Sequence, residues 1–286
     1  MSLLALSLII LSAFMHATWN YLAKRSGGGF AFVWLYLAVS IIVYAPFVIA
    51  MFIITTIHLG WVEIGFIVGS AIIHLVYSLT LQKGYKIGDF SLIYPVARGT
   101  GPMIVAIAAV FIFDESLSII GIIGILLIIG SVFAITGGIQ AIRKTSTVLP
   151  LVYGLIIGVI ISAYTLFDKG AVGVILIPPL LLNYGTFLGQ LLFLTPKALR
   201  NWEEVKSDWV NHRKEAIGVG ILNPLAYILV LSAMTFAPVS YVAPVREVSI
   251  LIGTIIGTKL LAEGFGMRRI IAAATMITGI IIVTIS

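Results

Sequence analysis

The chain is an almost unbroken series of apolar segments, each about 20 residues long, joined by short polar connections. An apolar segment of about 20 residues spans the roughly 30 Å hydrocarbon core of a bilayer as an α-helix. Transmembrane β-strands are shorter and alternate in polarity, which this sequence does not do. The pattern predicts an all-α polytopic membrane protein with ten transmembrane helices, at about residues 3–22, 30–54, 61–83, 89–113, 117–138, 149–169, 172–195, 214–235, 238–261 and 267–285.

One polar connection is longer than the others, residues 196–213, TPKALRNWEEVKSDWVNH. Trp202, Val205 and Trp209 recur within it at helical spacing. Tryptophan favours the headgroup region of a membrane. We therefore expect an interfacial amphipathic helix, with the binding of a partner protein as the alternative.

The composition agrees with a membrane protein and excludes several other classes. Hydrophobic residues make up 60% of the chain and charged residues 10%, whereas a soluble domain has about 25% charged residues. There is no cysteine, no G-x-x-x-x-G-K-[ST] phosphate loop, and no H-E-x-x-H or H-x-x-x-D motif. We expect no cofactor, no bound metal, no catalytic residues and no nucleic-acid partner. The expected partners are a small-molecule substrate and the lipid bilayer, and both a monomer and a homodimer are open.

An internal repeat divides the sequence. SLIYPVARGTGPMIVAIAAVFIFDESLS runs from Ser91 and SYVAPVREVSILIGTIIGTKLLAEGFG runs from Ser240. We predict two halves of five helices, residues 1–145 and 146–286. Because five is odd, the halves would be inserted in opposite orientations, as in many secondary transporters. With one residue deleted, the alignment pairs Pro95 with Pro244, Arg98 with Arg246 and Glu115 with Glu263.

The basic residues of the connections predict the orientation of the chain in the membrane. Fourteen Lys and Arg residues follow odd-numbered predicted helices, and one, Lys169, follows an even-numbered helix. Because cytoplasmic loops are enriched in Lys and Arg, we expect both termini to lie outside. The expected location is the plasma (inner) membrane of a bacterium or archaeon.

These features resemble the drug/metabolite transporter superfamily, and within it the EamA-type branch. The resemblance covers the whole chain and is carried by FDES at Glu115, LAEG at Glu263, HATWN from His16 and YPVARGTGP from Tyr94. It implies a central cavity lined mainly by the first, third, fourth, sixth, eighth and ninth helices. It also implies alternating access by rocking of the two halves, with export as the commoner direction.

Arg98 and Arg246 are the strongest candidates for a functional site. Each lies about nine residues into its predicted helix, or about 13 Å deep. A charge there costs at least about 2.5–3.5 kcal/mol, so such residues face the bundle interior. Pro95 and Pro244 precede them and would locally open the two helices. We expect a midplane site for an anion, because guanidinium groups bind carboxylate and phosphate bidentately; internal pairing with Glu247 and snorkelling are the alternatives.

The predicted function is therefore a secondary-active transporter, an exporter, of a small polar metabolite that carries a carboxylate or phosphate group. Because no ATP site is encoded, transport would use a gradient or exchange. Glu247 beside the arginines would suit a zwitterion, so an amino-acid exporter is one alternative. A flippase for a lipid-linked phosphate headgroup is another.

Other polar and aromatic residues in the apolar segments are weaker candidates, and plain packing is the alternative for each. The candidates for substrate contact are Tyr94, His16, Asn20, Trp19, Tyr77 and Tyr241, together with Glu247. Candidates for proton coupling are Glu247, His16 and His74. Glu115 and Glu263 end their helices, where we expect a helix-end contact, with gating as the alternative.

Overall fold

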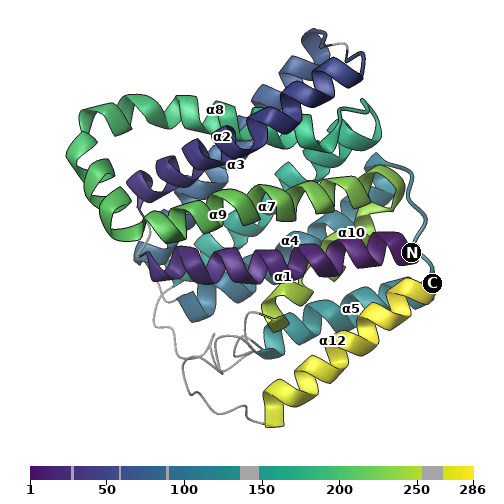
Figure 1. The fold of residues 1–286 in the computed structure, drawn as a ribbon. Coiled ribbons are helices and arrows are strands. Elements are labelled where there is room, and N and C mark those ends of the chain that lie inside the picture. The colour runs from purple at the N-terminus through teal and green to yellow at the C-terminus, as the bar shows by residue number, and fades with distance from the viewer. Residues whose placement is uncertain (27–28, 58, 88–89, 136–147, 253–266) are drawn as a thin grey trace.

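Helices form nearly all of the described part of the chain, residues 1–26, 29–57, 59–87, 90–135, 148–252 and 267–286, in this computed structural model (Figure 1). Long apolar segments with few breakers favour this outcome, because a helix satisfies its own backbone groups in lipid. The helices are α1 (Leu3–Arg25), α2 (Phe30–Ile54), α3 (Trp61–Ile87), α4 (Phe90–Ile112), α5 (Ile119–Ile135), α7 (Val148–Gly173), α8 (Pro179–Arg200), α9 (Trp202–Phe236), α10 (Val239–Val245) and α12 (Met267–Ile285).

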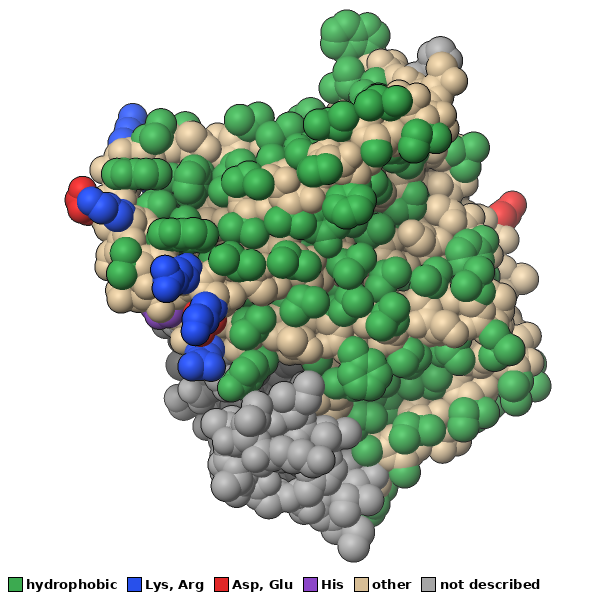
Figure 2. All heavy atoms as spheres, in the orientation of Figure 1, with side chains coloured by type: hydrophobic (Ala, Val, Ile, Leu, Met, Phe, Trp, Pro, Cys, Tyr) green, Lys and Arg blue, Asp and Glu red, His purple; other side chains and the backbone are tan. Residues whose placement is uncertain are grey.

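The surface of the bundle is apolar, as Figure 2 shows for one face. Within the described residues, five helical stretches are long and apolar enough to cross a bilayer. They are Leu3–Ala23, Phe30–Ile54, Trp61–Leu81, Leu151–Gly173 and Trp202–Phe236, and shorter apolar helices occur at Val96–Ile112, Ile119–Ala134 and Ile271–Ile285. This architecture is that of a polytopic α-helical membrane protein. The ten-helix inverted repeat, with halves 1–145 and 146–286, stays a prediction.

Helices far apart in the sequence pack in pairs: α1 against α9, α4 against α7, and α5 against α12. The pair α4 and α7 approaches very closely at Gly158. A Cβ atom on Gly158 would lie 2.9 Å from the Cβ of Thr100 and 3.2 Å from the carbonyl oxygen of Ala97. Small residues at helix contacts permit such an approach. Arg98 follows Ala97 on α4, so this contact fixes the position of Arg98 along the axis of the bundle relative to α7.

The two termini lie at the same end of the bundle (Figure 1). The N-terminal amine donates a hydrogen bond to the carbonyl oxygen of Thr284, at 3.0 Å. The Lys and Arg side chains visible in Figure 2 gather at the opposite end. The charge asymmetry that motivated the orientation is thus present in three dimensions, and the termini-outside orientation stays a prediction.

The polar segment 196–213 is helical on both sides of a break. α8 continues to Arg200, α9 begins at Trp202, and the backbone of His212 (φ −129°, ψ 24°) kinks α9. Val205 is buried, and the ring of Trp202 packs edge-on against Trp34 with centroids 6.0 Å apart. The segment therefore has an apolar face that packs on the bundle. Its depth in the membrane is still a prediction.

The helices that carry the two arginines differ in their backbone. α10 ends at Val245, Arg246 and Glu247 form a turn, and the chain is helical again at 248–252. In the turn the N–H of Glu247 donates to the carbonyl of Pro244, at 3.0 Å. α4 instead runs unbroken through Pro95, so the break expected there is not seen. Two adjacent charged residues, Arg246 and Glu247, follow Pro244, whereas Arg98 alone follows Pro95. Helix α10 ends directly before Arg246.

Candidate functional site

A buried ionic cluster lies where α4 meets the turn after α10. Glu247 is fully buried, and Arg98 and Arg246 are 5% and 4% exposed. Glu247 Oε2 lies 2.9 Å from Nε of Arg98, and Oε1 lies 3.9 Å from Nε of Arg246. Arg98 also donates from Nη2 to the hydroxyl of Ser249, at 3.3 Å. The two arginines therefore converge on one carboxylate, which sits closer to Arg98.

The cluster carries one more positive charge than negative, because two guanidinium groups share a single carboxylate. Neither Nε nor Nη2 of Arg246 has a hydrogen-bond partner among the described residues. A buried donor that is left unsatisfied is costly, and the guanidinium fork matches a carboxylate or phosphate. The arrangement leaves Arg246 as the group to which an incoming anion would bind.

A second buried polar cluster surrounds Asp168 of α7, which is fully buried. Asp168 Oδ2 accepts a hydrogen bond from the Tyr227 hydroxyl of α9, at 2.5 Å, and lies 2.9 Å from Nε2 of His74 on α3. A carboxylate only accepts hydrogen bonds, so this contact assigns a proton to Nε2. Asp168 Oδ1 has no hydrogen-bond partner within the described residues.

Aromatic rings form the wall around Asp168. The ring of Tyr164, one turn before Asp168 on α7, lies 4.3 Å from the His74 ring and 5.4 Å from that of Tyr77. Tyr227 packs edge-on against His74, with centroids 5.4 Å apart. Of the sequence candidates, His74 and Tyr77 therefore belong to this second cluster and not to the arginine cluster.

The two clusters are connected electrostatically. The charge of Arg246 acts on the hydroxyl of Tyr227, which also binds Asp168. The charges of Arg98 and Arg246 both act on the imidazole of His16. Arg246 therefore lies within electrostatic range of both Tyr227 and His16.

The residues of the HATWN motif separate into an inner and an outer set. The ring of His16 packs edge-on against Trp19, with centroids 4.8 Å apart, and faces the arginine cluster. Asn20 is exposed, and its side chain donates to the carbonyl of His16 in its own helix, at 2.7 Å. His16 is therefore partly buried beside Trp19, whereas Asn20 bonds within its own helix and does not reach the arginine cluster.

Tyr241 lies apart from the arginines, in the apolar core. A Cβ atom on Gly121 of α5 would lie 2.5 Å from its hydroxyl oxygen, so Tyr241 packs directly against α5. The side chains of Tyr94 and Pro95, and all of Glu263, lie outside the described residues.

Glu115 caps a helix at the end of the bundle that holds the termini. Its two carboxylate oxygens accept hydrogen bonds from the backbone N–H groups of Val239 (2.7 Å) and Ser240 (3.0 Å), at the start of α10. The ammonium of Lys169 donates to the carbonyls of Met234 (2.8 Å) and Ala237 (3.3 Å), at the end of α9. Each charge matches the helix end that it touches, since helix N-termini favour anions and C-termini favour cations.

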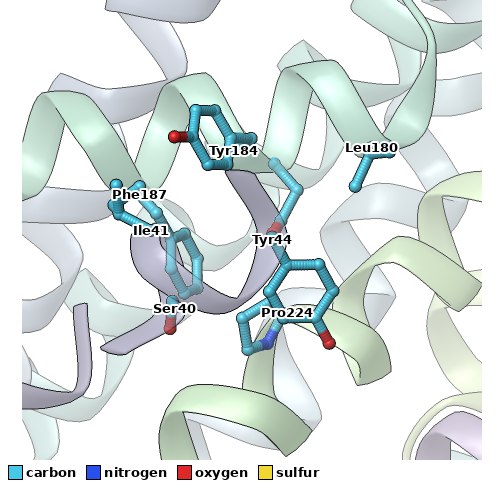
Figure 3. A pocket seen from close by; sticks show the side chains of 8 residues that line it. Ser40, Ile41, Tyr44, Leu180, Tyr184, Phe187 and Pro224 are labelled. Atoms are coloured by element: carbon cyan, nitrogen blue, oxygen red, sulfur yellow. The ribbon is translucent and has the colours of Figure 1, made fainter. Parts of the chain in front are cut away.

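A small pocket between α2, α8 and α9 has a structural explanation (Figure 3). Pro224 of α9 cannot donate to the carbonyl of Gly220, one turn earlier. The hydroxyl of Ser40 donates to that carbonyl, at 2.9 Å, and the hydroxyl of Tyr44 donates to the carbonyl of Ile221, at 2.7 Å. The hydroxyls of α2 thus satisfy the backbone at the proline, and this pocket is separate from the arginine cluster.

Sequence reasoning missed four residues of the buried polar region: Asp168, Tyr164, Tyr227 and Ser249. The sixth helix was predicted to end at residue 169, which placed Asp168 at its end, whereas α7 continues to Gly173. Two signals were available. An acidic residue within an apolar segment is a functional candidate by itself, and Tyr164 lies four residues before it, on the same helix face.

Comparisons with known proteins agree with this architecture. Residues 148–285 match the family model of the EamA-like transporter family. Twenty-nine chains of solved structures match the fold. One of them, described only as the crystal structure of a protein, aligns with 99% of this chain and 97% of its own, with a TM-score of 0.74 and 14% sequence identity. No curated protein sequence matches the chain.

The family match confirms the resemblance that the sequence motifs indicated. The chain carries an EamA-like segment, and the EamA family belongs to the drug/metabolite transporter superfamily. Members of this family are transporters and not enzymes. The protein is an integral, multi-pass membrane protein, and its second half, residues 148–285, is similar to a family of transporters.

Proposed function

We propose that the protein is a secondary-active transporter of a small metabolite that carries a carboxylate or phosphate group, and that Arg246 binds this group. One observation carries the proposal. Arg246 is 4% exposed, and two of its guanidinium nitrogens have no hydrogen-bond partner in the described part of the chain. A fixed charge this deep in an apolar bundle is retained where it serves a substrate or ion pathway.

The asymmetry of the ion pairs gives the two arginines different roles. Arg98 is held by Glu247 at 2.9 Å and by Ser249 at 3.3 Å, so it is already positioned. Arg246 lies 3.9 Å from the same carboxylate, beyond hydrogen-bonding distance. An anionic group of a substrate would complete the coordination of Arg246 and bring the charge of the cluster to zero. The substrate would then be bound in a cluster without net charge, which favours its burial.

The helix break at Arg246 and Glu247 would act as a hinge between the two flanking helices. Residues 246–247 are in a turn, with helix on both sides, so the two flanking helices can change their relative angle there. Broken helices in transporters place backbone and side-chain groups at the substrate site near the membrane midplane. In the proposed cycle, rocking of the two halves exposes Arg246 to one side of the membrane and then to the other.

Transport by purified protein in liposomes tests this function. The lumen is loaded with one of four labelled probes: succinate, glycerol 3-phosphate, L-alanine or choline. We expect the wild type to release at least one of the first three at ten or more times the rate of protein-free liposomes, and not to release choline. Arg246→Gln removes the charge and should reduce release to the protein-free rate.

The matched control is Arg25→Gln, because Arg25 is an arginine that pairs with a glutamate at the surface, 3.5 Å from Glu215. The control should transport as the wild type does. Equal transport by Arg246→Gln and wild type, or transport of choline alone, would overturn the anion site. Release of none of the soluble probes would direct the search to phosphate-bearing lipids in vesicles.

A further inference from the structure

We propose that His74 and Asp168 form a proton-binding site, and that a proton bound there is transported together with the anionic substrate. This inference rests on the proposed function. Its starting point is the burial of a full carboxylate charge: Asp168 is 0% exposed and has two donors on one oxygen, His74 Nε2 at 2.9 Å and Tyr227 at 2.5 Å.

The geometry defines the atom that takes up the proton. Nε2 of His74 already carries hydrogen and points at Asp168, so Nδ1 holds the free lone pair. The side chain of His74 is 15% exposed, whereas that of Asp168 is fully buried. Transfer of a proton from hydronium breaks an O–H bond, forms an N–H bond at Nδ1 and leaves a water molecule. The ring becomes an imidazolium, held by a carboxylate in contact with its other nitrogen, and the charge of the pair changes from −1 to 0.

The surroundings favour a proton over a larger cation. Metal cations such as Ca²⁺ and Mg²⁺ take six or more oxygen ligands. The described residues around Asp168 supply one carboxylate and the Tyr227 hydroxyl, and no group of three His, Asp or Glu side chains occurs within the described part of the chain. The rings of Tyr164, Tyr77 and Tyr227 pack against His74 or against one another and supply no further charged ligand. A proton needs no such set of ligands.

The charged and titratable groups that face this pair are few. Tyr227 approaches from α9 and Tyr164 lies on α7 itself, while Arg246 acts on Tyr227 from the turn after α10. Arg98 of α4 is engaged by Glu247. The buried polar residues described on α8 are Asn183, Thr186 and Gln190, none of which titrates. Lys169, the neighbour of Asp168 in sequence, donates to the end of α9.

The charge balance couples the proton to the substrate. Arg98, Arg246, Glu247 and Asp168 together sum to zero when His74 is neutral, counting two positive and two negative groups. A monoanion bound at Arg246 neutralises the arginine cluster and leaves the −1 of the His74–Asp168 pair uncompensated, and a proton on His74 then neutralises that pair. Because net charge is expensive in a low-dielectric interior, each ligand should favour the other. By linkage, the two effects are equal in size.

Nuclear magnetic resonance of nitrogen-15-labelled histidine in nanodiscs tests the site without any substrate. The His74 ring signals would be recorded between about pH 5 and about pH 8, the range in which histidine can act as a switch, and we expect them to change where Nδ1 gains a proton. His74→Gln assigns the signals. Asp168→Asn should move or abolish the change, and Tyr227→Phe, which keeps the ring, covers the case in which Asp168→Asn does not fold.

The matched control is His212→Gln, which removes the other described His–Asp pair, His212 with Asp208 at 3.5 Å near the surface. It should leave the His74 signals unchanged. A His74 ring whose signals stay constant across this range, or respond to pH identically in wild type, Asp168→Asn and Tyr227→Phe, would overturn the proton site.

Coupling is tested in proteoliposomes with an imposed pH gradient and labelled succinate or L-alanine as probes. We expect the wild type to accumulate a transported probe above its equilibrium level, and His74→Gln to equilibrate the same probe without accumulating it. Accumulation by His74→Gln would contradict the inference. If neither probe is transported while the histidine signals behave as expected, the proton site stands and the proposed anion substrate fails.

Discussion

Glu247 is shared by two guanidinium groups in a region from which water is excluded, so its charge matters more than that of any surface glutamate. Removing one member of a buried ionic cluster leaves the others uncompensated, which costs about 3–5 kcal/mol. We predict that Glu247→Gln lowers the stability of the protein by this amount, because Arg98 and Arg246 would then face each other without a carboxylate. Thermal unfolding in detergent measures the effect.

A double variant provides the control. Glu247→Gln combined with Arg98→Gln leaves one positive charge in the cluster, as in the wild type, and should recover a substantial part of the lost stability. A Glu247→Gln variant that melts with the wild type, or a double variant less stable than both single ones, would show that the carboxylate does not neutralise the arginines.

At this scale the sequence predicts which residues are buried, but less well which residues they contact. A charge within 20 apolar residues has to face the interior, which holds for Arg98 and Arg246. The repeat pairs Arg98 with Arg246, and in the structure the two arginines meet at Glu247. The contact of Asp168 with His74 joins residues 94 positions apart on different helices. No local pattern specifies it.

At the scale of helices, the junction between α9 and α10 depends on two side chains from other helices. Glu115 supplies the acceptors for the start of α10, and Lys169 supplies donors for the end of α9. Loss of a side chain that caps a helix N-terminus costs about 0.5–2 kcal/mol. We predict that Glu115→Ala lowers the unfolding free energy by about 2 kcal/mol, measured by denaturation in detergent.

The corresponding control is Glu203→Ala, because Glu203 is a glutamate in the first turn of a helix, exposed at the start of α9. It should leave stability nearly unchanged. Equal effects of the two substitutions would mean that the contacts of Glu115 with α10 add nothing beyond the general preference for acidic residues at a helix start.

Element boundaries show what a local pattern can and cannot predict. The apolar run predicts a helix at 238–261 from hydropathy, and α10 begins at Val239 as expected. Pro95 and Pro244 predict a break in each of the two repeat-related helices. Only the helix that contains Pro244 is broken, at Arg246 and Glu247, and α4 continues through Pro95. A proline permits a break but does not require one, so the residue pattern alone does not tell which of the two helices is broken.

For the whole molecule, apolar periodicity and length are sufficient to predict the class of fold. An alignment over 99% of the chain at 14% identity shows how little of the sequence this architecture requires. In this chain, small residues allow close helix contacts, such as Gly158 against Thr100, and apolar residues cover the face seen in Figure 2. A few buried polar residues within this frame carry the chemistry of the candidate site.

The central claim is that Arg246 is the anion-binding group of the transporter, and ligand-induced thermal stabilisation tests it most directly. Purified wild type, Arg246→Gln and Arg25→Gln would be melted with succinate, glycerol 3-phosphate, L-alanine or choline. A ligand that binds the folded state at a hundredfold excess over its Kd stabilises it by about 2.7 kcal/mol. We predict stabilisation of wild type and Arg25→Gln by an anion-bearing probe, lost in Arg246→Gln. Equal stabilisation of all three proteins, or stabilisation by choline alone, would contradict the account.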